Sequence, residues 1–327
     1  MLLIAFTGLT WAADPPSVIV DTDMLTDCDD AGALAMLHAL ADAGEVKILG
    51  FVLNGQDTHG KHSVVVAAIN RHYGRASLPI GVCKRPAGTT PRKASSYSRA
   101  IFEEFPHDGL IDEQRPDALR VYRQLLAAAP DHSVTIASIG FLTNLDSLLR
   151  SPGDAIDARD GLALVQDKVR LLSLMGGKYP SGKEYNLSFG GSADAARYVN
   201  EHWPDATVPM VFGGFELGGA VITGKVYVDA PQSPMRRCYE IAYESLKKGR
   251  PSWDQLTILH AVRGRVHHDV TYWTEVVGSN LVAADGTNTW QAVPQRRQVY
   301  LVRALDNAAM ATLVDGLMIR PPTLPGR

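Results

Sequence analysis

Residues 18–37, VIVDTDMLTDCDDAGALAML, join a short β-branched run to a helical pattern rich in small residues. Five aspartates fall within ten positions between the two, with no lysine or arginine among them: Asp21, Asp23, Asp27, Asp29 and Asp30. A helix N-terminus near Asp29 or Asp30 stabilises one or two carboxylates by about 0.3–1 kcal/mol each, which does not offset the repulsion among five. A divalent cation such as Ca²⁺ would offset it, because it takes about six to eight oxygen ligands.

Strand-like and helix-like segments alternate along the rest of the chain. The expected strands are short apolar runs at 17–20, 46–53, 78–82, 133–139, 169–175 and 207–212. The expected helices are at 30–44, 61–74, 116–129, 192–203, 234–247, 253–263 and 306–318, with short strand-like pieces between 270 and 302. This order predicts one α/β domain over 14–327, with a mostly parallel open sheet covered by helices on both faces. The acidic loop then lies at a strand's carboxyl end, where such sheets bind ligands.

The composition favours a globular protein with a small-molecule ligand. Hydrophobic residues make up 46% and charged residues 20% of 327 residues, enough for a large core. The formal net charge of −3 gives no reason to expect a nucleic acid as partner. Three cysteines, Cys28, Cys83 and Cys238, form no CxxC motif and do not establish the compartment.

The N-terminus, MLLIAFTGLTWAADPP, has the shape of a secretory signal peptide. A short apolar run precedes small residues at Ala12 and Ala13 and then a proline-containing polar stretch, although no basic residue precedes the run. The run is too short to span a bilayer, so we expect no membrane partner. We expect residues 1–13 to be a signal peptide and the protein to be periplasmic or secreted, with a cytoplasmic protein as the alternative.

A calcium site that is not an EF-hand explains the acidic loop best. Three other interpretations explain it less well: an EF-hand, a phosphatase site and a helix N-cap. An EF-hand counted from Asp21 needs Gly and Glu where Thr26 and Gly32 stand. A Mg²⁺-dependent phosphatase of the haloacid dehalogenase type begins with a strand and Asp-x-Asp, here Asp21 and Asp23, but leaves three aspartates unexplained; it remains a remote alternative. A solvated helix N-cap explains the last two aspartates and not the first two.

With this loop the sequence resembles the nucleoside hydrolase family. VDTDMLTDCDDAGAL is similar to the family's DTDxGxDDxxAL, with two extra residues between the DTD and DD elements. IASIGFLTNL is similar to GPLTN, SLMGG to MGG and KEYN to AEFN, and SWDQLTILHAV stands where the family has HDPLA. The five segments follow the family's order from residue 18 to about 263. Within the inosine- and uridine-preferring enzymes, the chain is most similar to a bacterial subgroup with DTDMxTDxDDAGAL and RPSWDQL patterns.

The resemblance implies a site, residue by residue. Calcium would be bound by Asp23, Asp29, Asp30, Asp254 and the backbone carbonyl of Thr143, and Asp23 would also be the general base. The residues implied for the substrate are Asp21, which supports the loop and the ribose site, Asp57, Met175, Glu184, Asn186 and Trp253. Asp57 is a loose match within LNGQDTHG, where Asn54 is the other candidate.

Two departures from the family pattern leave the substrate open. Trp253 stands where many members have a histidine, a candidate acid for the leaving base. A tryptophan cannot protonate a base at neutral pH, but its ring can stack on one, so it indicates a purine preference, another acid or lost activity. KYPSG also lacks the family's further ribose-binding asparagine, a space that Lys178 or Lys183 could fill.

The resulting prediction is a calcium-dependent N-ribohydrolase that cleaves nucleosides to free base and ribose through an oxocarbenium-like sugar. Asp23 would take the proton of the attacking water. The alternatives are a non-catalytic relative that keeps the calcium and ribose site, and a hydrolase of another glycoside. Family members are often dimers or tetramers, so a homo-oligomer is possible.

Overall fold

The computed structural model describes residues 14–86, 88–292 and 298–323. The segment 1–13, for which we expect a signal peptide, lies outside the described residues. In the described part of the chain, none of the helices has the length and the apolar character needed to cross a bilayer. The periplasmic or secreted location therefore stays a prediction.

One sheet of ten strands organises the described residues, in the order β4-β2-β1-β6-β7-β9-β16-β14-β15-β8. Its parallel part consists of β4 (Ile80–Val82), β2 (Lys47–Leu53), β1 (Ser17–Thr22), β6 (Val134–Ile139), β7 (Val169–Met175), β9 (Met210–Gly213) and β16 (Gln298–Arg303). Its antiparallel part consists of β14 (Trp273–Val282), β15 (Thr287–Gln291) and β8 (Ser181–Lys183). Two-residue strands form small ladders outside this sheet: β3 (Gln56–Asp57) with β5 (Arg92–Lys93), β10 (Ile222–Thr223) with β11 (Arg250–Pro251), and β12 (Val266–His267) with β13 (Val270–Thr271).

Helices occupy the connections between strands. The first half of the chain contains α1 (Asp29–Asp42), α2 (His62–His72), α3 (Ser98–Glu104), α4 (Ala118–Ala128), α5 (Thr143–Arg150) and α6 (Gly161–Lys168). The second half contains α7 (Tyr185–Ser188), α8 (Ser192–His202), α9 (Phe215–Gly219), α10 (Pro234–Ile241), α11 (Ser245–Lys248), α12 (Trp253–Arg263) and α13 (Asn307–Met318). Two 3₁₀ turns, η1 (Asp112–Gln114) and η2 (Lys225–Val228), complete the elements.

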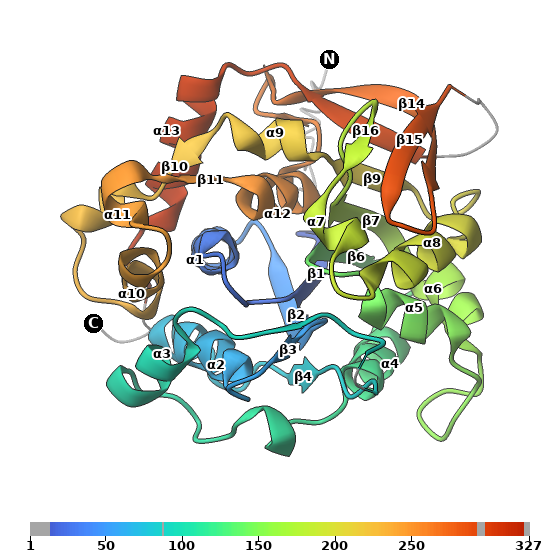
Figure 1. Ribbon diagram of the computed structural model, residues 1–327, viewed down its shortest axis with the longest axis horizontal. Coiled ribbons are helices and arrows are strands. Elements are labelled where there is room, and N and C mark those ends of the chain that lie inside the picture. Colours follow the sequence, from blue (N-terminus) through green and yellow to red (C-terminus); the bar gives the residue numbers. More distant parts are fainter. Residues whose placement is uncertain (1–13, 87, 293–297, 324–327) are drawn as a thin grey trace, which may run out of the picture.

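Both faces of the parallel sheet are buried, because successive side chains of a strand point to opposite sides. In β1, Val18 and Val20 belong to the core formed with α1, α2, α12 and α13, whereas Ile19 belongs to the core formed with α4, α5, α6 and α8. All three side chains have no exposed surface. A continuous apolar run therefore suits this strand. Figure 1 shows α1 near the middle of the molecule with α12 and α13 beside it, and α4, α5 and α6 on the other side of the strands.

The helix that follows the acidic loop is almost completely buried. Twelve of the fourteen residues of α1 are buried, among them Asp29 and Asp30 in its first turn. The helix ends before Gly44, which has φ of 75°, a left-handed conformation that favours glycine. The small side chains of α1 let it pack against neighbouring helices while its N-terminus points to the carboxyl edge of the sheet.

The predicted fold class is confirmed. All six predicted strands and the four predicted helices between them are present, with boundaries shifted by at most three residues. The helix predicted over 234–247 is wrong as one element: it is divided into α10 and α11, because Tyr243 and Glu244 have φ of 54° and 55°, outside the right-handed helical region. The helices that were not predicted, namely α3, α5, α6, α7 and α9, have only four to eight residues, which is too short for a helical period to be recognised in the sequence.

Candidate active site

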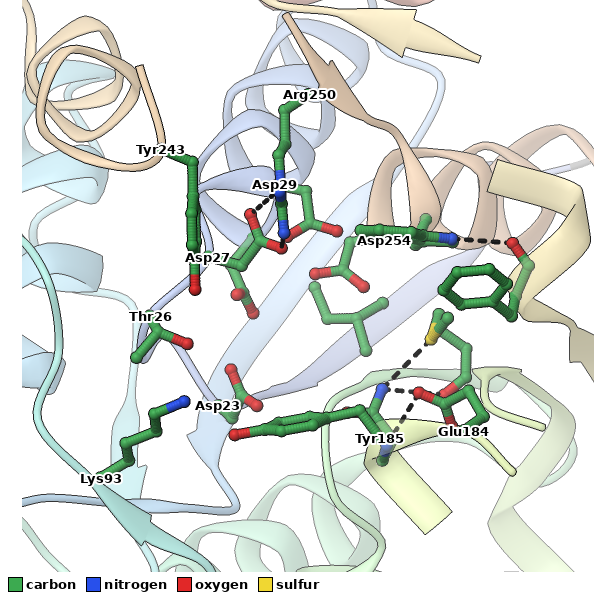
Figure 2. Close-up of a pocket in the computed structure, with 16 residues that line it drawn as sticks. Asp23, Thr26, Asp27, Asp29, Lys93, Glu184, Tyr185, Tyr243, Arg250 and Asp254 are labelled. Atoms are coloured by element: carbon green, nitrogen blue, oxygen red, sulfur yellow. Dashed lines mark hydrogen bonds and ion pairs between the residues drawn. The ribbon is translucent and has the colours of Figure 1, made fainter. Parts of the chain in front are cut away.

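A pocket of about 240 Å³ lies at the carboxyl ends of the parallel strands (Figure 2). The ends of β6 and β7, the loop after β1 and the N-termini of α1, α7 and α12 form its walls. The residues that line it are Asp23, Thr26, Asp27, Asp29, Asp30, Lys93, Ile139, Met175, Glu184, Tyr185, Asn186, Phe215, Tyr243, Arg250, Trp253 and Asp254. This is the position in which open α/β sheets bind ligands.

Three buried carboxylates meet at the base of the pocket. Asp29, Asp30 and Asp254 each offer an oxygen atom within 4.8 Å of the others. Two helix N-termini bring them together, because Asp29 and Asp30 lie in the first turn of α1 and Asp254 in the first turn of α12. Burial, and then the charges of the neighbouring aspartates, raise the pKa of all three carboxyl groups well above the usual range. A cluster of this kind fits a hard divalent cation, whose charge would keep the carboxyl groups ionised.

Asp23 lies beside this cluster, directly after β1. Its carboxylate accepts a hydrogen bond from the backbone N–H of Leu25 at 3.3 Å. Burial raises the pKa of Asp23 to about 7, and the charges of Asp29 and Asp27 act in the same direction. Asp23 is only 9% exposed, so the surface that it retains faces the pocket. It is placed to contact both a cation and a ligand.

Asp21 lies outside the pocket. Its Oδ1 accepts hydrogen bonds from the side-chain amides of Asn54 at 2.8 Å and Asn144 at 2.9 Å, and its Oδ2 accepts one from the Tyr122 hydroxyl at 2.9 Å. A Cβ atom at Gly140 would lie 2.6 Å from Asn54 Oδ1 and 2.8 Å from the Asp23 nitrogen, so this close approach requires glycine. Asp21 therefore supports the acidic loop from beneath.

Thr143 does not reach the pocket either. Its backbone carbonyl accepts hydrogen bonds from Arg85 Nη1 and from Ser147 Oγ, both at 3.0 Å, and its hydroxyl donates to the carbonyl of Asn54. The residue of this segment that does line the pocket is Ile139, the last residue of β6. A carbonyl ligand from this segment would therefore come from Ile139.

Asp57, the loosely aligned candidate, lines a separate hollow together with His62 and Cys83. Its carboxylate accepts hydrogen bonds from the Ser98 hydroxyl at 2.8 Å and from the backbone N–H of Ser95 at 2.9 Å. Asn54, the other candidate, bonds to Asp21. Neither residue lines the pocket that holds the carboxylate cluster.

The residues expected to bind the sugar face the cluster from β7 and α7. Glu184 caps α7, accepting hydrogen bonds from the backbone N–H groups of Asn186 at 2.8 Å and Gly177 at 3.1 Å. Burial raises the pKa of Glu184 to about 7. The Asn186 side chain donates to the backbone carbonyl of Met175 at 3.2 Å. Met175, Glu184 and Asn186 line the pocket, so a ligand bound at the carboxylate cluster would contact them.

The lysines suggested for the missing asparagine lie outside the pocket. Lys178 is over the ring of Phe215, and Lys183 pairs with Asp285 on the surface. Lys93 in β5 is the lysine that lines the pocket, with its ammonium 5.7 Å from the centre of the Tyr185 ring. Sequence reasoning missed it because a two-residue strand has no recognisable pattern.

Aromatic residues form the mouth of the pocket. Trp253 donates a hydrogen bond from its indole N–H to the carbonyl of Phe215 at 2.8 Å, and the two rings are 5.2 Å apart. Tyr185 and Tyr243 also line the mouth and are 39% and 52% exposed. These rings offer a flat apolar ligand a surface for stacking.

An ion pair closes one side of the mouth. The Arg250 Nε donates to Asp27 Oδ1 at 2.6 Å, and its Nη2 pairs with the other oxygen of the same carboxylate. Figure 2 shows the Arg250 side chain reaching down to Asp27, next to Asp29. The two residues are 223 positions apart, and no local pattern in the sequence indicates that they meet.

Fold and pocket together define an α/β protein with a ligand pocket and a metal-suited carboxylate cluster at the carboxyl edge of its sheet. The sequence pattern of the inosine-uridine preferring nucleoside hydrolases matches residues 18–312. The chain belongs to this family. It is a hydrolase that acts on N-glycosyl compounds, in a family that depends on a metal ion, and its substrate class is that of small nucleosides.

Solved structures share the fold at low sequence identity. A purine-preferring ribonucleoside hydrolase from Gardnerella vaginalis superposes with a TM-score of 0.67 at 15% identity, covering 92% of this chain and 99% of that one. An inosine-guanosine nucleoside hydrolase gives 0.68 at 16%, covering 92% and 98%. The type III effector protein XopQ, complexed with adenosine diphosphate ribose, gives 0.65 at 15%, covering 94% of each chain. A search of curated proteins found no match.

Proposed function

We propose that the protein is a calcium-dependent N-ribohydrolase that converts nucleosides to free base and ribose. The observation that carries this proposal is the convergence of Asp29, Asp30 and Asp254 beside Asp23 in the pocket at the carboxyl edge. All of these ligands are carboxylate oxygens, the type that Ca²⁺ prefers. These four aspartates, with the backbone carbonyl of Ile139, would hold the ion. When bound, it would supply positive charge and orientation to the sugar hydroxyls and the water.

The residues of the pocket then have separate roles in the reaction. Glu184 and Asn186 hold the hydroxyl groups of the sugar on the side facing α7. Asp23 takes a proton from the attacking water, a role typically worth about 10²–10⁴-fold in rate. The water oxygen bonds to the anomeric carbon as the bond to the base breaks, and the base takes the bonding electrons. Positive charge on the sugar ring is greatest in the transition state, when the bond to the base is largely broken and the bond to the water oxygen is only partly formed.

The aromatic mouth favours purine nucleosides as substrates. Trp253 and Phe215 offer a larger stacking area to a two-ring base than to a pyrimidine. Two of the structural relatives are themselves described as purine-preferring and as acting on inosine and guanosine.

Two other functions compete with this proposal, because Trp253 replaces the histidine found in many members. The second candidate is a non-catalytic ribose-binding protein, and the third is a hydrolase that acts on a glycoside other than a nucleoside. A signal peptide over 1–13 and a homo-oligomer remain predictions.

The test is release of free ribose from a panel of purine and pyrimidine nucleosides, with Ca²⁺ and again with a chelator. We expect release that the chelator abolishes and that is faster with purines. Asp23→Asn should lower turnover by about 10²-fold or more while nucleoside binding persists. Asp194→Asn, an exposed aspartate of α8 paired with Arg197, is the matched control. Chelator-insensitive release, or unchanged turnover in Asp23→Asn, would overturn the mechanism; binding without release in the unaltered protein would favour the non-catalytic candidate.

A further inference from the structure

The leaving base needs a hydrogen-bond donor that Trp253 cannot supply. When the bond to the sugar breaks, negative charge develops on the nucleobase, and a donor aimed at it speeds the step. The indole N–H of Trp253 is its only strong side-chain donor, and it is already bonded to the carbonyl of Phe215 at 2.8 Å. Any donor to the leaving base must therefore come from another residue near the Trp253 ring.

Arg250 is the cationic donor packed against that ring. Its guanidinium carbon lies 5.4 Å from the centre of the Trp253 ring and 4.3 Å from that of Tyr243, and all three residues line the pocket. A base stacked at Trp253 would lie beside this guanidinium. Lys93, the other cation of the pocket, instead lies over the rings of Tyr185 and Phe189. In Figure 2, Lys93 and Arg250 are on opposite sides of the acidic cluster.

The guanidinium of Arg250 has an unused hydrogen-bond donor and a fixed orientation. Its Nε and Nη2 bond to the carboxylate of Asp27, whereas its Nη1 has no acceptor in the described part of the chain. A planar guanidinium held by two parallel bonds on one edge presents its remaining N–H groups in a set direction. These groups are available to a carbonyl oxygen or a ring nitrogen of a nucleobase.

Asp27 is itself held in place. Its Oδ1 accepts a hydrogen bond from the backbone N–H of Cys28 at 2.7 Å, and its carbonyl accepts one from the buried Tyr97 hydroxyl at 2.6 Å. Asp27 lies in the acidic loop that is two residues longer than the pattern DTDxGxDD. The longer loop thus provides the carboxylate that orients Arg250.

We propose that Arg250 stabilises the departing nucleobase by donating a hydrogen bond to it, and that Asp27 acts as the positioning residue for Arg250. This inference rests on the proposed function. The bond between the anomeric carbon and the base nitrogen breaks with its electron pair going to the base, while the proton of the attacking water goes to Asp23. Arg250 keeps its own protons, because a guanidinium stays charged at working pH, and the base takes its proton from solvent.

The experiment compares two substrates that differ in how much help the leaving group needs. Inosine releases hypoxanthine as an anion that is more basic than p-nitrophenolate and needs more stabilisation, whereas p-nitrophenyl β-D-ribofuranoside releases a phenolate that is stable as an anion. We expect Arg250→Gln to lower kcat/KM for inosine by about 10²-fold and to change that for the nitrophenyl riboside by less than about threefold. Arg250→Lys should recover part of the loss, and Asp27→Asn should show a smaller loss with the same dependence on the leaving group.

The control is Arg237→Gln, because Arg237 also pairs through two bonds with one carboxylate, that of Glu104, but on the surface. It should leave both substrates unaffected. Equal losses on the two substrates in Arg250→Gln, or no loss on either, would overturn the role of Arg250. An unaffected Asp27→Asn would overturn the role of Asp27. If the unaltered protein cleaves neither substrate, the proposed function itself fails, and the inference fails with it.

Discussion

The side-chain amide of Asn54 donates a hydrogen bond to Asp21 Oδ1 at 2.8 Å, and its own carbonyl oxygen accepts one from the backbone N–H of Phe141 at 2.9 Å. One asparagine thereby connects the start of the acidic loop to the loop after β6. Both Asp21 and Asn54 are fully buried. The site that Asp23 and Ile139 both line depends on this polar connection beneath it.

Asp21→Ala should therefore destabilise the fold more than it alters the chemistry. The substitution leaves two buried amides and the Tyr122 hydroxyl without their acceptor, and each such group costs about 1–3 kcal/mol. We expect a loss of about 3 kcal/mol or more in the free energy of unfolding, measured with urea. Asp21→Asn, which keeps the shape and one acceptor, should lose less. Stability equal to the unaltered protein in Asp21→Ala would contradict the supporting role of Asp21.

Calcium should raise the thermal stability of the protein, since the folded state brings Asp29, Asp30 and Asp254 together and the unfolded state does not. At a calcium concentration about 100-fold above Kd the expected stabilisation is about 2.7 kcal/mol. The measurement is the shift in Tm on adding Ca²⁺ after chelation, with Mg²⁺ giving a smaller shift because it demands a tighter octahedral site. Asp254→Asn should remove most of the shift, and Asp194→Asn should retain it. A full shift in Asp254→Asn would place the cation elsewhere.

The parts of the fold and the site that the sequence predicts are those with a local signal. The run at 17–20 is apolar on both faces and short, which identifies a buried parallel strand before any partner is known. Asp23 directly follows a parallel strand of the sheet, where such sheets bind ligands, and Glu184 and Asp254 lie at the N-termini of helices, positions that favour carboxylates.

Other features depend on contacts that no local pattern encodes. The bond between Arg250 and Asp27 joins residues 223 positions apart, so only the folded chain brings them together. The resemblance implies a carbonyl ligand at Thr143. Of this segment, however, Ile139, four residues earlier, lines the pocket and Thr143 does not. The match of Asp57 to a ribose-binding residue depends on a loop without fixed spacing. In the structure the carboxylate of Asp57 accepts a hydrogen bond from the backbone N–H of Ser95.

Trp253 should contribute to affinity for purine nucleosides through stacking. Trp253→Ala should raise KM for inosine by about 5–10-fold, in line with about 1 kcal/mol for an aromatic pair, and raise that for uridine less. Trp253→Phe, which keeps a ring, is the matched comparison. Gly218 offers an independent test, because a Cβ atom there would lie 2.5 Å from the Trp253 Cα and would displace the ring. An equal rise in KM for both nucleosides in Trp253→Ala would argue against stacking.

A buried histidine far from the pocket should make the fold sensitive to acid. His38 in α1 has no exposed surface, lies 2.9 Å from Asn70 Oδ1 through its Nε2, and stacks on Tyr73 at 4.7 Å. Burial, and then the charge of Arg75, lower its pKa to about 3 from an ordinary value of 6.5. Between these two values the unfolded chain binds a proton at this position that the folded chain does not, so protonation favours unfolding.

The contribution of His38 to stability is thus complete above about pH 6.5 and is lost as the pH falls toward 3. Between pH 7 and pH 5 we expect this residue to account for about 2 kcal/mol of the decrease in the free energy of unfolding. His38→Gln, which can keep the bond to Asn70 but does not titrate, should be less stable at pH 7 yet lose about 2 kcal/mol less on acidification. His202→Gln, at the exposed end of α8, is the control. Urea unfolding at the two pH values measures the difference, and an identical decrease in His38→Gln and the unaltered protein would show that His38 is not the group responsible.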